Sequence, residues 1–210
     1  MSTLEGIERA KKLNLASSHK ADVMISSRVF EASIIFTPLN HGRLFTIFRH
    51  PIERAVSLFY YTQDMIWRRG NVKDLMEISI EEYFKGGMGD DNWMTRFLAN
   101  AKNKVLTDDD LDVAKEVLRR KCVVGLLSEK GESMTRFMKY FGWDKLVRGE
   151  KEQDCIDKML DYAWPQKHRH EEVEEGSDIW DLIVQKNEYD LKLFDYAKTL
   201  FSAQSKLFAR

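Results

Sequence analysis

Hydrophobic positions along the chain follow two alternating patterns, short apolar runs and helical repeats. Residues 44–48 form a short, mostly apolar run, which is typical of a strand buried on both faces of a parallel sheet, and residues 122–127 form a second strand-like run. Helical spacing of apolar residues follows each run, at 52–67 and at 132–141. A strand followed by a helix, repeated along the chain, predicts an α/β domain with a parallel sheet.

Start and stop signals predict further helices. Thr107 precedes three aspartates, and the segment closes with Arg119-Arg120-Lys121, so the charges match the two ends of a helix dipole. Helices are also predicted at 3–13, 79–84, 92–99 and 187–206. Residues 23–36 fit a strand or a buried helix equally well. The polar interval 144–176 is predicted to be a loop.

The composition fits a globular domain that holds no general nucleic-acid site. The chain has 210 residues, 43% of them hydrophobic, which is enough for a real core. Lys and Arg total 33 against 34 Asp and Glu, whereas a nucleic-acid binder carries a basic excess. No stretch approaches the roughly 20 apolar residues of a membrane span, and no signal-peptide block is present. Two cysteines make no disulfide framework, and Cys122 is expected as a buried reduced thiol.

The segment after the first apolar run can bind an anion. Arg49 follows the strand directly, at the edge where α/β folds bind ligands, and Pro51 is suited to the first turn of a helix. The free N–H groups of that helix and its positive end face the same point. Arg49 offers a two-pronged hydrogen bond and Ser57 a hydroxyl, which together predict a monophosphate cradle. Spacing alone equally allows a surface arginine and a small packing serine.

Residues 44–61, LFTIFRHPIERAVSLFYY, resemble the 3′-phosphate-binding motif of sulfotransferases, especially the heparan sulfate 2-O and 6-O type. That motif is an apolar strand, then Arg-x-Pro-x-x-Arg-x-x-Ser, then aromatic residues. The resemblance implies that Arg49 and Ser57 hold the 3′-phosphate of the nucleotide. It gives Arg54 a mainly structural role, and His50 stands where many relatives have Asp.

Three later blocks extend the resemblance over about 44–204. Residues 92–98 resemble an Asn-x-x-Thr-Arg-x-Leu block, 124–133 a strand-to-helix segment, and 187–194 the closing helix of the family. The resemblance implies a helix-rich, P-loop-NTPase-like parallel sheet flanked by helices. It also implies sulfuryl transfer from 3′-phosphoadenylyl sulfate to a carbohydrate hydroxyl, without a metal. The relatives are anchored in the Golgi, which predicts a Golgi lumenal setting. Apart from the resemblance, Arg96 and Lys102 could meet an anionic sugar chain, although an exposed helix face explains them equally well; only Arg96 is assigned to the carbohydrate acceptor.

A complete member of the family begins with a strand and a Lys-x-Gly-Ser/Gly-Thr-like loop around the 5′-phosphosulfate. Backbone N–H groups of such a loop cradle the phosphate, and its lysine neutralises charge on the leaving oxygen. No such loop precedes Arg49, and the glycines at 86–89 follow no strand. We therefore expect one sulfotransferase-like domain over 1–210 that lacks its first strand–loop–helix unit. Such a loss would expose strand 44–48 and predicts marginal stability or aggregation.

Transfer to a hydroxyl needs a general base. The resemblance assigns this role to His19, although the glycine that precedes the base in relatives is absent, and His41 is the second candidate. Either histidine could instead be a solvated surface residue. His168 and His170 lie beside two glutamates, but two histidines without other fixed ligands are better explained by a polar loop than by a metal site.

Two other functions remain open from the sequence. The chain can be a non-catalytic nucleotide- or glycan-binding remnant that keeps the 3′-phosphate cradle. It can also be an interaction protein whose helices only inherit the fold. Binding of the nucleotide without turnover would favour the first, and neither binding nor turnover would favour the second.

Overall fold

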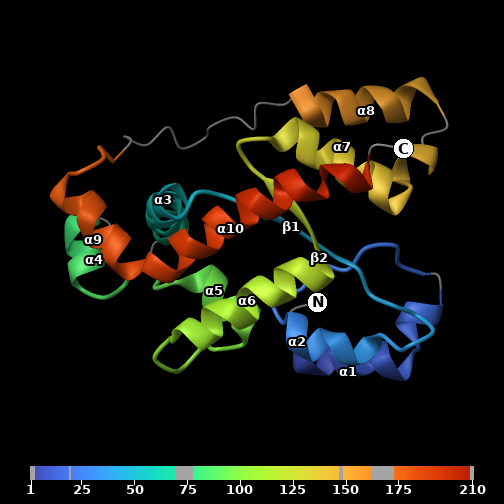
Figure 1. Ribbon diagram of the computed structural model, residues 1–210, viewed down its shortest axis with the longest axis horizontal. Helices are drawn as coiled ribbons and strands as arrows, with labels where there is room; N and C mark the ends of the chain where they lie inside the picture. The colour runs from blue at the N-terminus through green and yellow to red at the C-terminus, as the bar shows by residue number, and fades with distance from the viewer. Residues whose placement is uncertain (1–2, 19, 70–77, 147–148, 162–172, 209–210) are drawn as a thin grey trace. The chain divides into compact units, whose positions relative to one another are not determined.

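The computed structural model describes residues 3–18, 20–69, 78–146, 149–161 and 173–208 (Figure 1). Contacts divide the chain into two compact units, Met1–Leu44 and Phe45–Arg210. Each unit has buried apolar residues of its own. The candidate phosphate-binding residues Arg49 and Ser57 both belong to the second unit, so that unit is the one that positions the site.

The first unit is a small helical cluster. Its elements are α1 (Leu4–Lys12), α2 (Val29–Ala32) and the 3₁₀ turns η1 (Leu15–Ser17) and η2 (Ser33–Ile35). Helix α1 begins at Leu4 because the Thr3 hydroxyl accepts a hydrogen bond from the N–H three residues later. Ile7 and Ala10 on one face of α1 pack against Ala32 and Ile35. The prediction for 3–13 is confirmed, and part of 23–36 forms short helical turns.

The second unit is helix-rich around a small parallel sheet, which agrees with the α/β class. Strands β1 (Leu44–Phe48) and β2 (Cys122–Leu126) form the two-stranded sheet. The helices are α3 (Pro51–Arg69), α4 (Ile80–Lys85), α5 (Trp93–Ala99), α6 (Asp108–Lys121), α7 (Lys130–Phe141), α8 (Glu150–Asp161), α9 (Asp178–Lys186) and α10 (Glu188–Gln204), with 3₁₀ turns η4 (Trp143–Leu146) and η5 (Ser205–Leu207).

The two strands differ in burial. All five residues of β2 are buried, as is typical of a strand inside a parallel sheet. The prediction that residues 44–48 are buried on both faces is wrong, because Phe45 and Ile47 are 37% and 41% exposed. These two side chains point to one face of the strand. Aromatic rings of α7 and η4 pack against Phe45 on that face.

Side chains rather than a third strand occupy the outer edge of β2. The Gln204 amide, at the end of α10, accepts from Val124 N–H and donates to the Cys122 carbonyl, both at 2.9 Å. The Ser133 hydroxyl, buried in α7, bonds both the N–H and the carbonyl of Leu126. Figure 1 shows α10 passing beside β2, with which it is in contact. The edge opposite β1 is therefore closed from within the unit.

Helix positions agree with the sequence in most places and differ in one. Helices α3 to α7 and α10 are confirmed with small shifts at their ends. Helix α8 contradicts the predicted loop over 144–176, because carboxylates and amines four positions apart, such as Asp154 and Lys158, support a polar helix. No helix within the described ranges is both long enough and apolar enough to cross a membrane.

Candidate functional site

The candidate site lies at the carboxyl end of β1. The two strands end side by side there, since Leu127 N–H donates to the Phe48 carbonyl at 2.8 Å. Arg49 and His50 follow at once, and α3 begins at Pro51. The first helical hydrogen bond runs from Arg54 N–H to the His50 carbonyl. A strand end and a helix start therefore meet within two residues, as predicted, and both favour an anion.

Arg49 is partly exposed and has a single partner. Its side chain is 31% exposed, and Nε donates to Oε2 of Glu53 at 3.2 Å. Glu53 is 63% exposed and lies in the first turn of α3. The terminal nitrogens Nη1 and Nη2 of Arg49 make no bond to any group in the described part of the chain. These two nitrogens are the edge of the guanidinium that binds a phosphate in a two-pronged manner.

Ser57 lies one helical turn beyond Glu53 and is half-buried. A serine inside a helix often turns its hydroxyl back to the carbonyl four residues earlier. Within the described residues the Ser57 hydroxyl makes no such bond, so its donor is available. Among the described residues, Arg49 and Ser57 thus both keep uncommitted donors, one just before α3 and one in its second turn.

His50 faces a different environment from Arg49. Its ring lies edge-on to Phe194 of α10, with the centroids 5.3 Å apart, and nearly parallel to Trp180 of α9 at 6.3 Å. An aromatic ring suits this environment better than a carboxylate, because a carboxylate would lose hydration there without gaining a charged partner. His50 therefore fits the packing around it.

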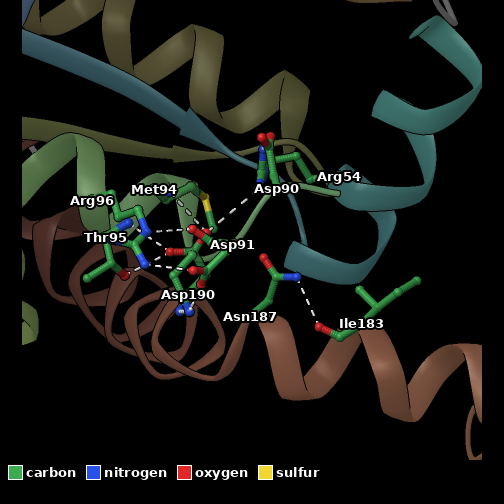
Figure 2. A network of polar contacts seen from close by, with 10 residues as sticks. Arg54, Asp90, Asp91, Met94, Thr95, Arg96, Ile183, Asn187 and Asp190 are labelled. Atoms are coloured by element: carbon green, nitrogen blue, oxygen red, sulfur yellow. Dashed lines mark hydrogen bonds and ion pairs between the residues drawn. The ribbon is translucent and has the colours of Figure 1, made fainter. Parts of the chain in front are cut away.

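Arg54 lies in a network of polar contacts that joins four segments of the chain (Figure 2). Its Nη1 donates to Oδ2 of Asp90 at 3.0 Å, and its Nη2 lies 3.8 Å from Oδ2 of Asp190. The guanidinium also lies 5.5 Å from the centre of the Trp93 ring. Its Nε and Nη2 are buried and form no hydrogen bond within the described residues. Arg54 thus links α3 to the loop before α5 and to α10, which is a structural role.

Asp190 is the centre of this network. It is fully buried, and its carboxylate accepts bonds from the N–H groups of Met94 and Thr95 and from the Thr95 hydroxyl, at 2.7–2.9 Å. The carboxylate thereby caps the positive end of α5 from a distant helix. Burial raises the pKa of Asp190 above its usual range, although these bonds and the charge of Arg54 act to lower it.

Asn92 adds to the connection between α5 and α10, and Asn187 joins the start of α10 to α9. The Asn92 side chain accepts a bond from Asp190 N–H at 3.0 Å, and its backbone has a left-handed φ of 47°, which asparagine tolerates. Asn187 is buried and donates to the Ile183 carbonyl at 2.9 Å. These residues open the second and fourth sequence blocks. The blocks therefore meet in space, which their order in the sequence does not reveal.

Arg96 is engaged inside its own loop. It donates to the carbonyls of Ala101 and Lys104 and to both the carbonyl and the carboxylate of Asp91. An open cleft of about 790 Å³ lies beside this loop, with Trp93, Arg96 and Lys102 in its wall. The sequence assigned Arg96 to the acceptor. In this structure its side chain shapes the wall of the cleft and holds the 101–104 turn.

Of the two predicted bases, His41 lies within the described residues, and it belongs to the first unit. His19, the first candidate, is outside them, as are His168 and His170. His41 is exposed in the loop before β1 and makes no hydrogen bond to the described residues. A search of the same residues finds no cluster of His, Cys, Asp and Glu that could hold a metal ion.

Comparisons of the chain with protein-family models, with curated proteins and with solved structures find no match. The site must therefore be interpreted from its own residues.

Proposed function

We propose that this chain binds 3′-phosphoadenylyl sulfate through the 3′-phosphate and is a sulfotransferase that acts on a carbohydrate hydroxyl. The observation that carries the proposal is the pair of donors without partners among the described residues, the Arg49 terminal nitrogens at the carboxyl end of a parallel strand and the Ser57 hydroxyl in the helix that follows. An arginine fork and a hydroxyl beside a helix start match a phosphate monoester in charge and geometry. The likeness of the motif to that of sulfotransferases supports the nucleotide.

The parallel strands and their flanking helices are compatible with a P-loop-NTPase-like sheet, which is the fold that this proposal requires. In the reaction, the acceptor oxygen forms a bond to sulfur while the bond between sulfur and the bridging phosphate oxygen breaks. The hydroxyl proton passes to a base, for which His19 is the candidate, and 3′-phosphoadenosine 5′-phosphate leaves. By the same resemblance the setting is the Golgi lumen.

The described residues contribute binding rather than chemistry. Arg49 and Ser57 would fix the nucleotide through a group that does not react, so that binding energy at this end orients the sulfate at the other. The Arg54–Asp190 network holds α3, which carries Ser57, against α5 and α10. In this arrangement the scaffold is buried, whereas Arg49 is partly exposed and Ser57 half-buried.

Calorimetric titration with 3′-phosphoadenosine 5′-phosphate tests the proposal. We expect Arg49→Ala to weaken binding by about 10- to 100-fold, because charge-assisted hydrogen bonds contribute about 1.5–3 kcal/mol. Ser57→Ala should cost about fivefold, the value of one neutral hydrogen bond. Arg119→Ala is the matched control, since Arg119 is an exposed arginine paired with a glutamate on α6.

Equal affinity of the wild type and Arg49→Ala would overturn the phosphate cradle, as would absence of binding by a folded wild-type chain. Where binding is found, transfer of labelled sulfate from the donor to a glycan separates an enzyme from a binding protein. Binding without transfer would leave only the nucleotide-binding half of the proposal.

A further inference from the structure

The ion pair between Arg49 and Glu53 uses a particular nitrogen. Glu53 accepts from Nε, on the inner side of the guanidinium, and not from Nη1 or Nη2 at its tip. An acid bound at the tip would compete with a phosphate for the same donors. An acid bound at Nε leaves the two-pronged edge free and restricts rotation of the fork.

The position of Glu53 supports this geometry. It belongs to the first turn of α3, where the helix dipole favours a negative side chain. It also lies four positions before Ser57, so the two residues share one flank of the helix. Arg49 reaches this flank from the turn before the helix. The carboxylate therefore holds the fork against the flank of α3 that carries Ser57.

We infer that Glu53 is a positioning residue that orients Arg49 for the 3′-phosphate; this inference rests on the proposed function. Without the carboxylate, Arg49 would sample many rotamers and lose that freedom on binding. Glu53 does not touch the nucleotide, and its own charge opposes that of the phosphate. Its hydrogen bond should therefore matter more than its charge.

Three variants separate orientation from charge in calorimetric titrations with 3′-phosphoadenosine 5′-phosphate. Glu53→Ala removes the acceptor and should weaken binding about three- to tenfold, because the arginine must then be ordered on binding. Glu53→Gln keeps an acceptor oxygen and should bind within about twofold of the wild type. Glu81→Ala is the matched control, since it removes an exposed glutamate paired with a base four positions away on α4.

A double-mutant cycle shows whether Glu53 acts through Arg49. In an Arg49→Lys background the Nε donor is gone, while a point charge still binds phosphate measurably. Glu53→Ala should cause no further loss there, because the Nε hydrogen bond that orients the planar fork is already absent. Adenosine 5′-monophosphate serves as a second probe. It lacks the 3′-phosphate, so its affinity should not change when Glu53 is replaced.

The outcomes distinguish this inference from the proposed function. If Arg49→Ala weakens binding but Glu53→Ala binds as tightly as the wild type or more tightly, the cradle stands and the positioning role falls. Equal losses in Glu53→Ala and Glu53→Gln would also overturn it, since charge rather than orientation would then decide. If the folded wild type does not bind 3′-phosphoadenosine 5′-phosphate, both fall together. Circular dichroism confirms that each variant is folded.

Discussion

Two arginines five positions apart in one motif have opposite surroundings. Arg54 is 19% exposed and lies between two aspartates, whereas Arg49 is 31% exposed and keeps its tip free. A mutation of Arg54 would leave the buried carboxylate of Asp190 without its cation and so would affect folding. A mutation of Arg49 removes a partly exposed pair, which contributes little to stability. If an Arg49 variant is folded but binds the nucleotide more weakly, the loss can therefore be attributed to the binding site.

The reactivity of the two cysteines tests how tightly β2 is packed. Burial raises the pKa of the Cys122 thiol to about 12, while Cys155 is an exposed free thiol. Because only the thiolate reacts, a disulfide reagent at neutral pH should modify one cysteine per folded chain. Labelling followed by peptide mass spectrometry should find Cys155 modified at once and Cys122 only in denaturant. Rapid modification of Cys122 under native conditions would contradict the packing of β2.

At the residue scale, the sequence indicated where candidate residues lie better than it indicated their hydrogen-bond partners. Arg49 and Ser57 could be predicted because a strand end, a proline and a helix start are all local signals. The partners of Arg96 could not, since two of them are backbone carbonyls presented by a turn. That turn depends on a left-handed backbone at Asn100, which the sequence does not reveal.

At the scale of elements, helix ends were the most predictable feature. Ser79 and Thr107 are joined to acids three positions later, and Gly142 ends α7 with a φ of 69°. Helix α8 was missed because its helical support comes from charged pairs rather than an apolar stripe. Polar helices of this kind resemble loops in composition.

Gln204 offers a test of how the sheet edge is closed. In Gln204→Ala the N–H of Val124 and the carbonyl of Cys122 lose their side-chain partners. Leaving a buried backbone group unpaired costs roughly 1–3 kcal/mol. Water that enters the space left by the side chain can bond these two groups in part, so we expect the unfolding free energy to fall by about 1–3 kcal/mol in total. Urea unfolding followed by circular dichroism measures it.

Ser202→Ala is the control for Gln204→Ala, since Ser202 is exposed on the same helix. It should change the unfolding free energy by less than about 0.5 kcal/mol. Equal stability of the Gln204→Ala chain and the wild type would show that the edge of β2 does not depend on this amide.

At the scale of the whole molecule, the two strands of the sheet differ in how they are covered within the described residues. Gln204 and Ser133 satisfy the outer edge of β2, whereas β1 exposes the side chains of Phe45 and Ile47. An uncharged apolar strand of this kind favours association between copies. The sequence predicted exposure of strand 44–48, but it could not show that the outer edge of β2 is closed.

We expect Ile47→Lys to reduce self-association at concentrations of tens of micromolar, because a charge on an exposed strand opposes pairing between strands. Size-exclusion chromatography with light scattering across a dilution series provides the measurement. Leu39→Lys is the matched control, since Leu39 is 94% exposed but lies outside any strand. An equal improvement in both variants would indicate general solubility rather than an effect of the strand.

The bond between Gln204 and β2 also sets an order of events during synthesis. Val124 and Gln204 are 80 positions apart, so at roughly 5–20 residues per second the ribosome needs about 4–16 s to supply the amide after the strand is made. During that interval the backbone groups of the nascent strand that Gln204 later bonds remain unpaired. Translation speed late in the message therefore governs how long an early strand is open to chaperones and to neighbouring nascent chains.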